Sequence, residues 1–219
     1  MADKKSRVDL KIILLGTSGA GKTSLTNRYI HDEFSNTEST IGASFALKSW
    51  KRFKLGIWDT AGQEKYAALG SFYSRNAGAA ILVYDPTSKA SFDELPRYVK
   101  ILESAEPNCV VTLVASKSDL VESHPTLRAV SESDAREYAR VHDYGYFETS
   151  SMTGKNVLPL FESIALTCLG SQMTEEERTS DARSATPSSA ATTNTPANDR
   201  IRLHDAPSGA QANKAGCCS

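Results

Sequence analysis

A glycine-rich segment near the amino terminus has the composition and spacing of a phosphate-binding loop. The stretch LLGTSGAGKTS fits the pattern G-x-x-x-x-G-K-[ST], between an apolar run and a helical pattern. Glycines allow the backbone N–H groups from Gly19 to Thr23 to surround phosphate oxygens at the positive end of a helix. Lys22 would place a compact charge on the β- and γ-phosphates, and the Thr23 hydroxyl would ligate Mg²⁺, which prefers oxygen ligands. The phosphate-contacting residues predicted in this way are Gly16, Ser18, Gly19, Ala20, Gly21, Lys22, Thr23 and Ser24. The segment indicates a nucleoside triphosphate, but it does not separate a kinase, an ATPase and a GTP switch.

A second group of chemically useful residues follows a strand pattern farther along the chain. RFKLGIW runs into DTAGQEKY, so Asp59 lies at a strand end, where a P-loop protein needs its Mg²⁺ carboxylate. Gly62 can bring its N–H close to a γ-phosphate because it carries no Cβ. Gln63 then stands where a side chain can orient an attacking water, and we assign it the catalytic role.

The elements that must position these residues alternate between strand-like and helical patterns. VDLKIILLG, GAAILVYD and CVVTLVAS are continuous apolar runs of strand length, as expected for parallel strands covered on both faces. ASFALKSW and RFKLGIW follow one another almost directly and predict an antiparallel hairpin at a sheet edge. We therefore predict an α/β fold of the P-loop NTPase class. It has a mostly parallel six-stranded sheet, one antiparallel edge strand, and helices on both faces.

Three helical segments show where they begin. Ser131, followed by Asp134, predicts an N-cap. Pro96 falls inside a segment opened by Ser91 and Glu94, where it sets the start of the regular helix or kinks it. After Asn156, one helical stripe carries Val157, Leu160, Phe161, Ile164, Ala165 and Cys168.

The composition changes after about residue 170. The segment TSDARSATPSSAATTNTPANDRIRLHDAPSGAQANKAG has almost no large apolar residue, so it cannot offset its ordering entropy by burial. We divide the chain into a flexible amino terminus (1–7), one folded domain (8–170), a disordered hypervariable tail (171–216) and a terminal segment (217–219) that consists of two cysteines and a serine.

Composition excludes several classes of protein. The formal net charge of −1 disfavours nucleic-acid binding, which needs a basic face. No apolar run follows the amino-terminal charges, and no stretch approaches the roughly 20 apolar residues of a membrane span. Ala2 in place of glycine excludes myristoylation, and four scattered cysteines make no disulfide framework. We expect a cytosolic protein.

Five motifs in this order and at these separations resemble the Ras superfamily: the phosphate loop, TIGASF, WDTAGQE, SKSD and ETSSMTG. The paired cysteines at the end and the TIG form of the first switch are similar to the Rab family, and TIGASF with SKSD to its endosomal and autophagy-linked subgroup. The similarity covers roughly residues 8–170, the GTPase domain, and the last three residues. It implies a slow GTPase that cycles between GDP and GTP with Mg²⁺ and regulates vesicle or endosomal traffic.

The resemblance also implies roles for individual residues. Thr40 would ligate Mg²⁺ and contact the γ-phosphate in the GTP state, and Phe34 would lie against guanine. Asp119 would accept hydrogen bonds from guanine N1 and N2, which favours GTP over ATP. Lys117 would pack along the base, and Ser151 would give its N–H to O6. Beyond the phosphate loop, the implied nucleotide contacts are Phe34, Thr40, Gly62, Ser116, Lys117, Asp119, Ser150, Ser151 and Met152. The implied metal ligands are Thr23, Thr40 and Asp59, and the implied effector-binding residues are Ile41, Phe45, Trp58 and Tyr73.

The chain departs from the family pattern at three places near the site. Ser116 replaces an asparagine that ties the base-binding loop to the phosphate loop, and Met152 replaces a lysine. One weakened hydrogen bond of about 1 kcal/mol would raise nucleotide dissociation about fivefold. The span from Thr40 to Asp59 is shorter than in most Rabs, so effectors that contact the hairpin tip would be excluded.

The two cysteines at the end of the chain, Cys217 and Cys218, are either an incidental pair or lipid acceptors. The resemblance favours two geranylgeranyl groups, because Gly216 rules out the single-cysteine C-a-a-X signal. The tail has no polybasic patch, so both lipids should be needed. The implied partners are effectors, a GEF, a GAP that supplies an arginine in trans, Rab escort protein, GDI and the membrane, with no nucleic acid. We expect a monomer in the cytosol and on the cytoplasmic face of endomembranes, endosomal or autophagic.

Two other functions remain open at this point. In the first, Ser116 and Met152 loosen the nucleotide so far that the domain is a non-catalytic scaffold, although Lys22, Asp59 and Asp119 argue against it. A P-loop kinase or ATPase is disfavoured by Asp119 and by the lack of a lid segment.

Overall fold

The computed structural model describes residues 8–35, 37–62 and 72–174, all of which belong to the first of two units of the chain, residues 1–179. Several predictions fall outside these residues. They are the flexible segment 1–7, the catalytic Gln63, nearly all of the tail, and the lipid acceptors Cys217 and Cys218.

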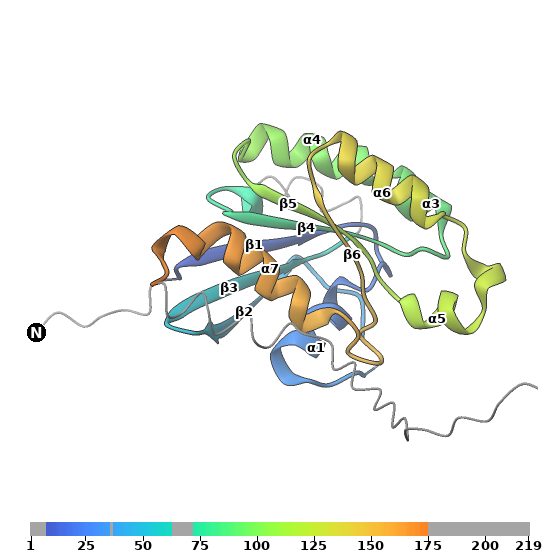
Figure 1. Ribbon diagram of the computed structural model, residues 1–219, viewed down its shortest axis with the longest axis horizontal. Helices are drawn as coiled ribbons and strands as arrows, with labels where there is room; N and C mark the ends of the chain where they lie inside the picture. Colours follow the sequence, from blue (N-terminus) through green and yellow to red (C-terminus); the bar gives the residue numbers. More distant parts are fainter. Residues whose placement is uncertain (1–7, 36, 63–71, 175–219) are drawn as a thin grey trace, which may run out of the picture. The chain divides into compact units, whose positions relative to one another are not determined.

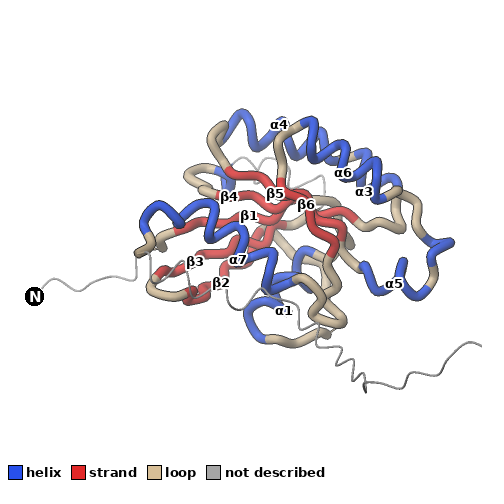
Figure 2. Tube along the Cα trace, viewed as in Figure 1, coloured by secondary structure: helices blue, strands red, loops and turns tan. Residues whose placement is uncertain are grey.

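A single six-stranded sheet forms the centre of the described domain (Figures 1 and 2). Its spatial order is β2-β3-β1-β4-β5-β6. The strands are β1 (Leu10–Leu15), β2 (Ala43–Trp50), β3 (Phe53–Thr60), β4 (Ala79–Tyr84), β5 (Val110–Ala115) and β6 (Gly145–Glu148). Only β2 runs antiparallel to its neighbour, with Phe45 opposite Trp58, while the other pairs are parallel. The predicted sheet and its antiparallel edge hairpin are confirmed.

Helices cover both faces of this sheet, as predicted (Figure 1). α1 (Lys22–His31) and α7 (Val157–Leu169) cover one face, and α3 (Lys89–Asp93), α4 (Leu95–Ala105) and α6 (Glu132–Val141) cover the other. α5 (Ser118–Ser123) follows β5, and the short 3₁₀ turns are η2 (Pro125–Leu127) and η3 (Gly170–Gln172). No helix within residues 8–35, 37–62 and 72–174 is long and apolar enough to cross a membrane.

The structure tests the predicted helix starts directly. The Ser131 side chain accepts the N–H of Asp134, so the predicted N-cap of α6 is confirmed. Pro96 lies in the first turn of α4, where its missing N–H costs nothing. The prediction that Ser91 opens this segment is wrong. α3 begins earlier, after Ser88, whose side chain accepts the Ser91 N–H.

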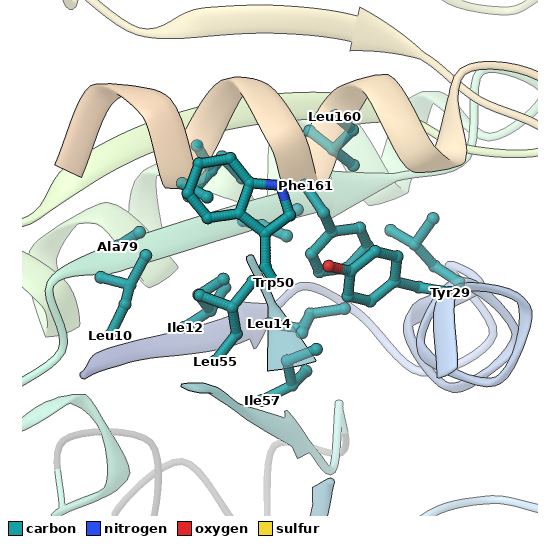
Figure 3. Close-up of a cluster of buried hydrophobic side chains, with 14 of the residues drawn as sticks. Leu10, Ile12, Leu14, Tyr29, Trp50, Leu55, Ile57, Ala79, Leu160 and Phe161 are labelled. Carbon is teal, nitrogen blue, oxygen red and sulfur yellow. The ribbon is translucent and has the colours of Figure 1, made fainter. Parts of the chain in front are cut away.

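Alternation along the strands divides the interior into two hydrophobic clusters. On β1, Ile12 and Leu14 face α1 and α7, while Ile13 and Leu15 belong to the cluster beneath α4 and α6. Burying each such side chain contributes about 1.5–3 kcal/mol. Figure 3 shows the first cluster, in which the rings of Tyr29 and Phe161 stack with centroids 3.8 Å apart. The predicted stripe of α7 is buried here, and Cys168, half-buried, packs against it.

The tip of the β2–β3 hairpin joins the same cluster. Trp50 and Phe53 stack with centroids 6.2 Å apart, in the cluster that also contains Leu169 and Met173. The Arg52 guanidinium donates a hydrogen bond to the backbone carbonyl of Gln172. The hairpin tip is therefore fixed to the carboxyl end of the described domain.

Candidate nucleotide-binding site

The phosphate loop connects the end of β1 to the start of α1 and lies against β4. Gly16 has φ 147°, and a Cβ there would come within 2.1 Å of the carbonyl oxygen of Val83. Gly21, the N-cap of α1, has φ 94°, a left-handed conformation that favours glycine. These two glycines are required by the close packing and by the turn, so the motif has a local physical basis.

Lys22 lies inside the loop that it follows. Its side-chain Nζ donates to the backbone carbonyls of Gly16 and Thr17, at 2.8 and 2.7 Å. The residue is 5% exposed, and burial lowers the pKa of its ammonium group to about 8, although the nearby Asp59 carboxylate opposes the shift. A buried cation is stabilised by a neighbouring anion, so this position favours a phosphate ligand.

Three oxygen ligands from separate segments converge beside Lys22. Thr23 Oγ1 donates to Asp59 Oδ2 at 2.6 Å and lies 2.9 Å from Thr40 Oγ1, which in turn is 3.4 Å from Asp59 Oδ2. Asp59 is 1% exposed, and its Oδ1 is buried without a hydrogen-bond partner. Burial raises the pKa of the Asp59 carboxyl above its ordinary value. A divalent cation would satisfy the orphaned oxygen and stabilise the carboxylate, so the predicted Mg²⁺ ligands fit the metal.

A cavity of about 360 Å³ lies over these groups and is lined by the phosphate loop and by residues 34, 35 and 37–40. Gly62 closes one side of it. A Cβ on Gly62 would come within 2.4 Å of the backbone nitrogen of Ser18, so no side chain fits there in this conformation. The structure thus brings Gly62 against the phosphate loop, and the approach of its N–H to a γ-phosphate stays a prediction.

A second cavity, of about 200 Å³, continues from the first through shared lining residues. Its walls are formed by Gly21, Ser24, Phe34, Ser116, Lys117, Asp119, Leu120, Ser151 and Met152. Ser150 lies behind this wall and donates its hydroxyl to Asp119 Oδ1 at 2.5 Å, which orients the carboxylate. A mainly apolar slot with one fixed carboxylate suits a flat base that carries adjacent N–H donors.

Comparison with known proteins agrees with this geometry. The Ras family model matches residues 11–169. The chain is similar to "Ras-related protein Rab-24" of Dictyostelium discoideum, with 39% identity over 74% of this chain and 81% of the relative. It is 42% identical to "GTP-binding protein ypt3" of Schizosaccharomyces pombe, over 70% of this chain and 73% of the relative. It is also 42% identical to "Ras-related protein RABF2b" of Arabidopsis thaliana, over 72% of this chain and 80% of the relative. The chain is a small GTPase of the Rab family.

The family assignment settles the class of activity. Rab GTPases hydrolyse GTP as monomers, so this Rab GTPase is an enzyme. GTP or GDP with Mg²⁺ is the ligand set of the family, and effectors, GEFs, GAPs and GDI are its general partners.

Ser116 makes a hydrogen bond to the phosphate loop, although its short side chain led us to expect a weakened connection. Its hydroxyl donates to the backbone carbonyl oxygen of Ala20 at 2.6 Å, and the backbone carbonyl oxygen of Tyr84 lies 3.0 Å from the same hydroxyl. The base-binding loop of this Rab GTPase therefore remains tied to the phosphate loop without an asparagine. The fivefold faster nucleotide release stays a prediction.

Asp85 is a site residue that the sequence analysis missed. Its Oδ2 accepts a hydrogen bond from Lys117 Nζ at 2.6 Å, and its Oδ1 accepts from the N–H and hydroxyl of Thr87. Burial alone would raise the pKa of Asp85, but these bonds hold it below the ordinary value. The sequence contains a pattern that could have identified Asp85, because this residue follows an apolar strand and lies at the same sheet edge as Asp59.

The predicted effector-binding residues come from three places: Phe45 and Trp58 lie on the β2–β3 hairpin, Ile41 precedes β2, and Tyr73 precedes β4. Phe45 and Trp58 contact each other across the two strands, with ring centroids 4.6 Å apart. Ile41 is 82% exposed, and Phe45 is largely exposed as well. Tyr73 packs with Trp58 against the second core cluster, although its own ring contact is with Phe72. Their role in effector binding remains a prediction.

Proposed function

We propose that this Rab GTPase switches between GDP and GTP states to control a step of vesicle or endosomal membrane traffic. The observation that carries the proposal is the convergence of Thr40 with Thr23 and Asp59. Thr40 comes from a segment that lines the phosphate cavity, so a ligand bound there would contact this segment. A loop that closes on a γ-phosphate and is released after hydrolysis is the basis of a GTP switch.

The phosphates are held by the backbone N–H groups of residues 18–24 and by Lys22, at the amino end of α1. Thr23, Thr40 and Asp59 hold Mg²⁺, which neutralises charge on the phosphate oxygens when it is bound. Gly62 approaches the γ-phosphate through its backbone N–H. Binding of GTP therefore connects two segments, near Thr40 and Gly62, through one ligand.

Guanine is selected by groups around the second cavity. Asp119 accepts from N1 and N2, and its carboxylate is oriented by Ser150. Ser151 donates its backbone N–H to O6, while Phe34 and the Lys117 stem lie against the faces of the base. Adenine lacks this donor pattern, and a carboxylate left facing an acceptor loses about 1–3 kcal/mol.

Hydrolysis needs a water aligned with the γ-phosphate, and Gln63 is the residue that we assign to this task. Charge that develops in the transition state is stabilised by an arginine from a GAP, which can raise the rate by about 10³–10⁵. On this basis the isolated enzyme is slow.

Attachment to membranes requires geranylgeranyl groups on Cys217 and Cys218, added with Rab escort protein and shielded by GDI. Two lipids anchor a protein firmly, whereas one gives marginal binding. The protein then divides between cytosol and the cytoplasmic face of endomembranes. The TIGASF and SKSD motifs support an endosomal or autophagic compartment.

The decisive experiment measures nucleotide retention and turnover. Purified protein is loaded with a fluorescent GDP in Mg²⁺, and its dissociation is followed, then single-turnover hydrolysis of GTP is compared with the Gln63→Leu variant. We expect release over minutes or longer and hydrolysis that the substitution abolishes. Release within milliseconds, with no hydrolysis that depends on Gln63, would overturn the proposal in favour of a scaffold.

Two further tests address the base and the lipids. Asp119→Asn should shift preference from guanosine to xanthosine nucleotides, because an amide can donate to the additional carbonyl of xanthine. A variant with both Cys217 and Cys218 replaced by serine should leave membranes, and its retention there would contradict the lipid anchor.

A further inference from the structure

One arginine of α1 reaches across the domain to the loop that faces the base. Arg28 Nε donates to the backbone carbonyl of Ser151 at 2.6 Å, and Nη2 donates to the carbonyl of Met152 at 2.9 Å. The Arg28 side chain is only 15% exposed. A guanidinium that satisfies two consecutive carbonyls in a largely buried position restrains both peptide groups.

The opposite end of the guanidinium is also fixed. Nη1 donates to the backbone carbonyl of Asp32 at 2.8 Å and to its carboxylate at 3.1 Å. Asp32 is the C-cap of α1, so Arg28 joins the carboxyl end of this helix to the segment 151–152. The amino end of the same helix carries Lys22 and Thr23 of the phosphate loop. One helix therefore orients the parts of the site that face the phosphates and the part that faces the base.

We propose that Arg28 is a positioning residue for guanine recognition. A held carbonyl fixes the whole plane of the peptide that follows its residue, so Arg28 fixes the two planes after Ser151 and Met152. Because the Ser151 N–H is attached to the same Cα as the first of these carbonyls, this restraint limits rotation of the Ser151 backbone and keeps its N–H in place. This backbone belongs to a loop that lines the base cavity through Ser151 and Met152. The inference rests on the proposed contact between the Ser151 N–H and guanine O6, and adds the residue that holds the contact in place.

Arginine is suited to this task and lysine is not. A planar guanidinium presents several N–H donors in fixed directions and can bond adjacent carbonyls together. An ammonium group has a shorter reach and no fixed plane, so it can hold one carbonyl but not both in register. Arg28→Lys therefore keeps the charge and removes the geometry.

The test compares GDP with 6-thio-GDP, in which sulfur, a weaker acceptor, replaces O6 while the N1 and 2-amino donors remain. Dissociation rates of both nucleotides are measured for the wild type, for Arg28→Lys, and for the control Asp32→Asn. The control removes the ion pair, but leaves the bonds from Arg28 to the loop, and asparagine tolerates the left-handed φ of 57° at this position.

We expect the wild type and Asp32→Asn to release 6-thio-GDP faster than GDP. Arg28→Lys should release GDP about 5- to 30-fold faster, because buried backbone groups lose their partners, while its release of 6-thio-GDP changes much less. The preference for GDP is thus reduced in this variant alone.

Other outcomes distinguish an error in the proposed O6 contact from an error in the role of Arg28. If the wild type does not distinguish the two nucleotides, the proposed O6 contact is wrong. If the wild type distinguishes them and Arg28→Lys does so equally well, or weakens both equally, Arg28 is only structural and the inference is overturned. Arg28→Gln, which keeps a planar amide donor, is measured in the same way should the lysine variant fail to fold.

Discussion

Removal of the Ser116 hydroxyl tests whether the tie between the two nucleotide-binding loops controls release of the nucleotide. Ser116 is 2% exposed and donates at 2.6 Å to the Ala20 carbonyl, which is also buried. Ser116→Ala leaves this carbonyl without its donor, at a cost of about 1–2 kcal/mol within the usual range for such groups. If the two loops separate when the nucleotide leaves, the unpaired carbonyl destabilises the nucleotide-bound protein more than the nucleotide-free protein. GDP dissociation then becomes about 5- to 30-fold faster, since about 1.4 kcal/mol corresponds to tenfold.

The assay is the release of a fluorescent GDP in excess Mg²⁺, with thermal unfolding measured in parallel. Ser88→Ala is the matched control, because it removes an N-cap hydrogen bond of α3 worth about 1 kcal/mol without lining either nucleotide cavity. It should lower the melting temperature and leave the dissociation rate unchanged. The reasoning fails if Ser116→Ala releases GDP at the wild-type rate, or if Ser88→Ala accelerates release to the same extent.

Three other substitutions test the phosphate, metal and base contacts. Asp85→Asn removes the charged partner of Lys117, and after solvent screening should accelerate GDP release about fivefold. Because the folded pKa of Asp85 is depressed, its carboxylate stabilises the fold above about pH 4. Thermal unfolding of wild type and variant should therefore converge only below that pH, as protonation removes the contribution. Asp59→Ala should release GDP at least tenfold faster (about 1.4 kcal/mol), and its release rate should not depend on Mg²⁺. A response to EDTA equal to that of the wild type would contradict the metal assignment. Gly62→Ala places a methyl group 2.4 Å from the Ser18 nitrogen, which prevents the close approach of residue 62 to the phosphate loop. GDP should still bind, while single-turnover GTP hydrolysis should fall at least tenfold. Hydrolysis at the wild-type rate would show that this close approach is not needed.

The sheet could be predicted because its determinants are local. ASFALKSW and RFKLGIW are separated by one residue, which leaves room only for a tight hairpin, and β2 covers the first of them completely. The buried parallel strands carry unbroken apolar runs, a pattern that neither an exposed strand nor a loop produces. The start of α3 was misplaced because several serines compete as caps, and only the folded backbone shows that Ser88 accepts the hydrogen bond.

Site residues could be predicted where the chemistry depends on a motif, and not where it depends on tertiary contacts. Lys22, Thr23 and Asp59 follow strands that end at the same sheet edge, so their convergence is implied by topology. The hydrogen bonds of Arg28 join residues more than a hundred positions apart, and nothing in the helical pattern of α1 distinguishes this arginine from a solvated one. The hydrogen bond of Ser116 to the phosphate loop could not be predicted for a similar reason. Whether a hydroxyl reaches the Ala20 carbonyl depends on the spacing of two loops, which the residue type alone does not specify.

The anchored hairpin tip limits which part of β2 a partner protein can contact. β2 has eight residues, and at about 3.3 Å per residue its two ends are about 23 Å apart. One end adjoins Thr40, and the other, through Trp50, is packed beside Met173. Trp50 and Phe53 are buried, so neither side chain of this tip is available to a partner protein. A partner that recognises the loop near Thr40 instead meets exposed aromatic surface at the opposite end of the strand, at Phe45.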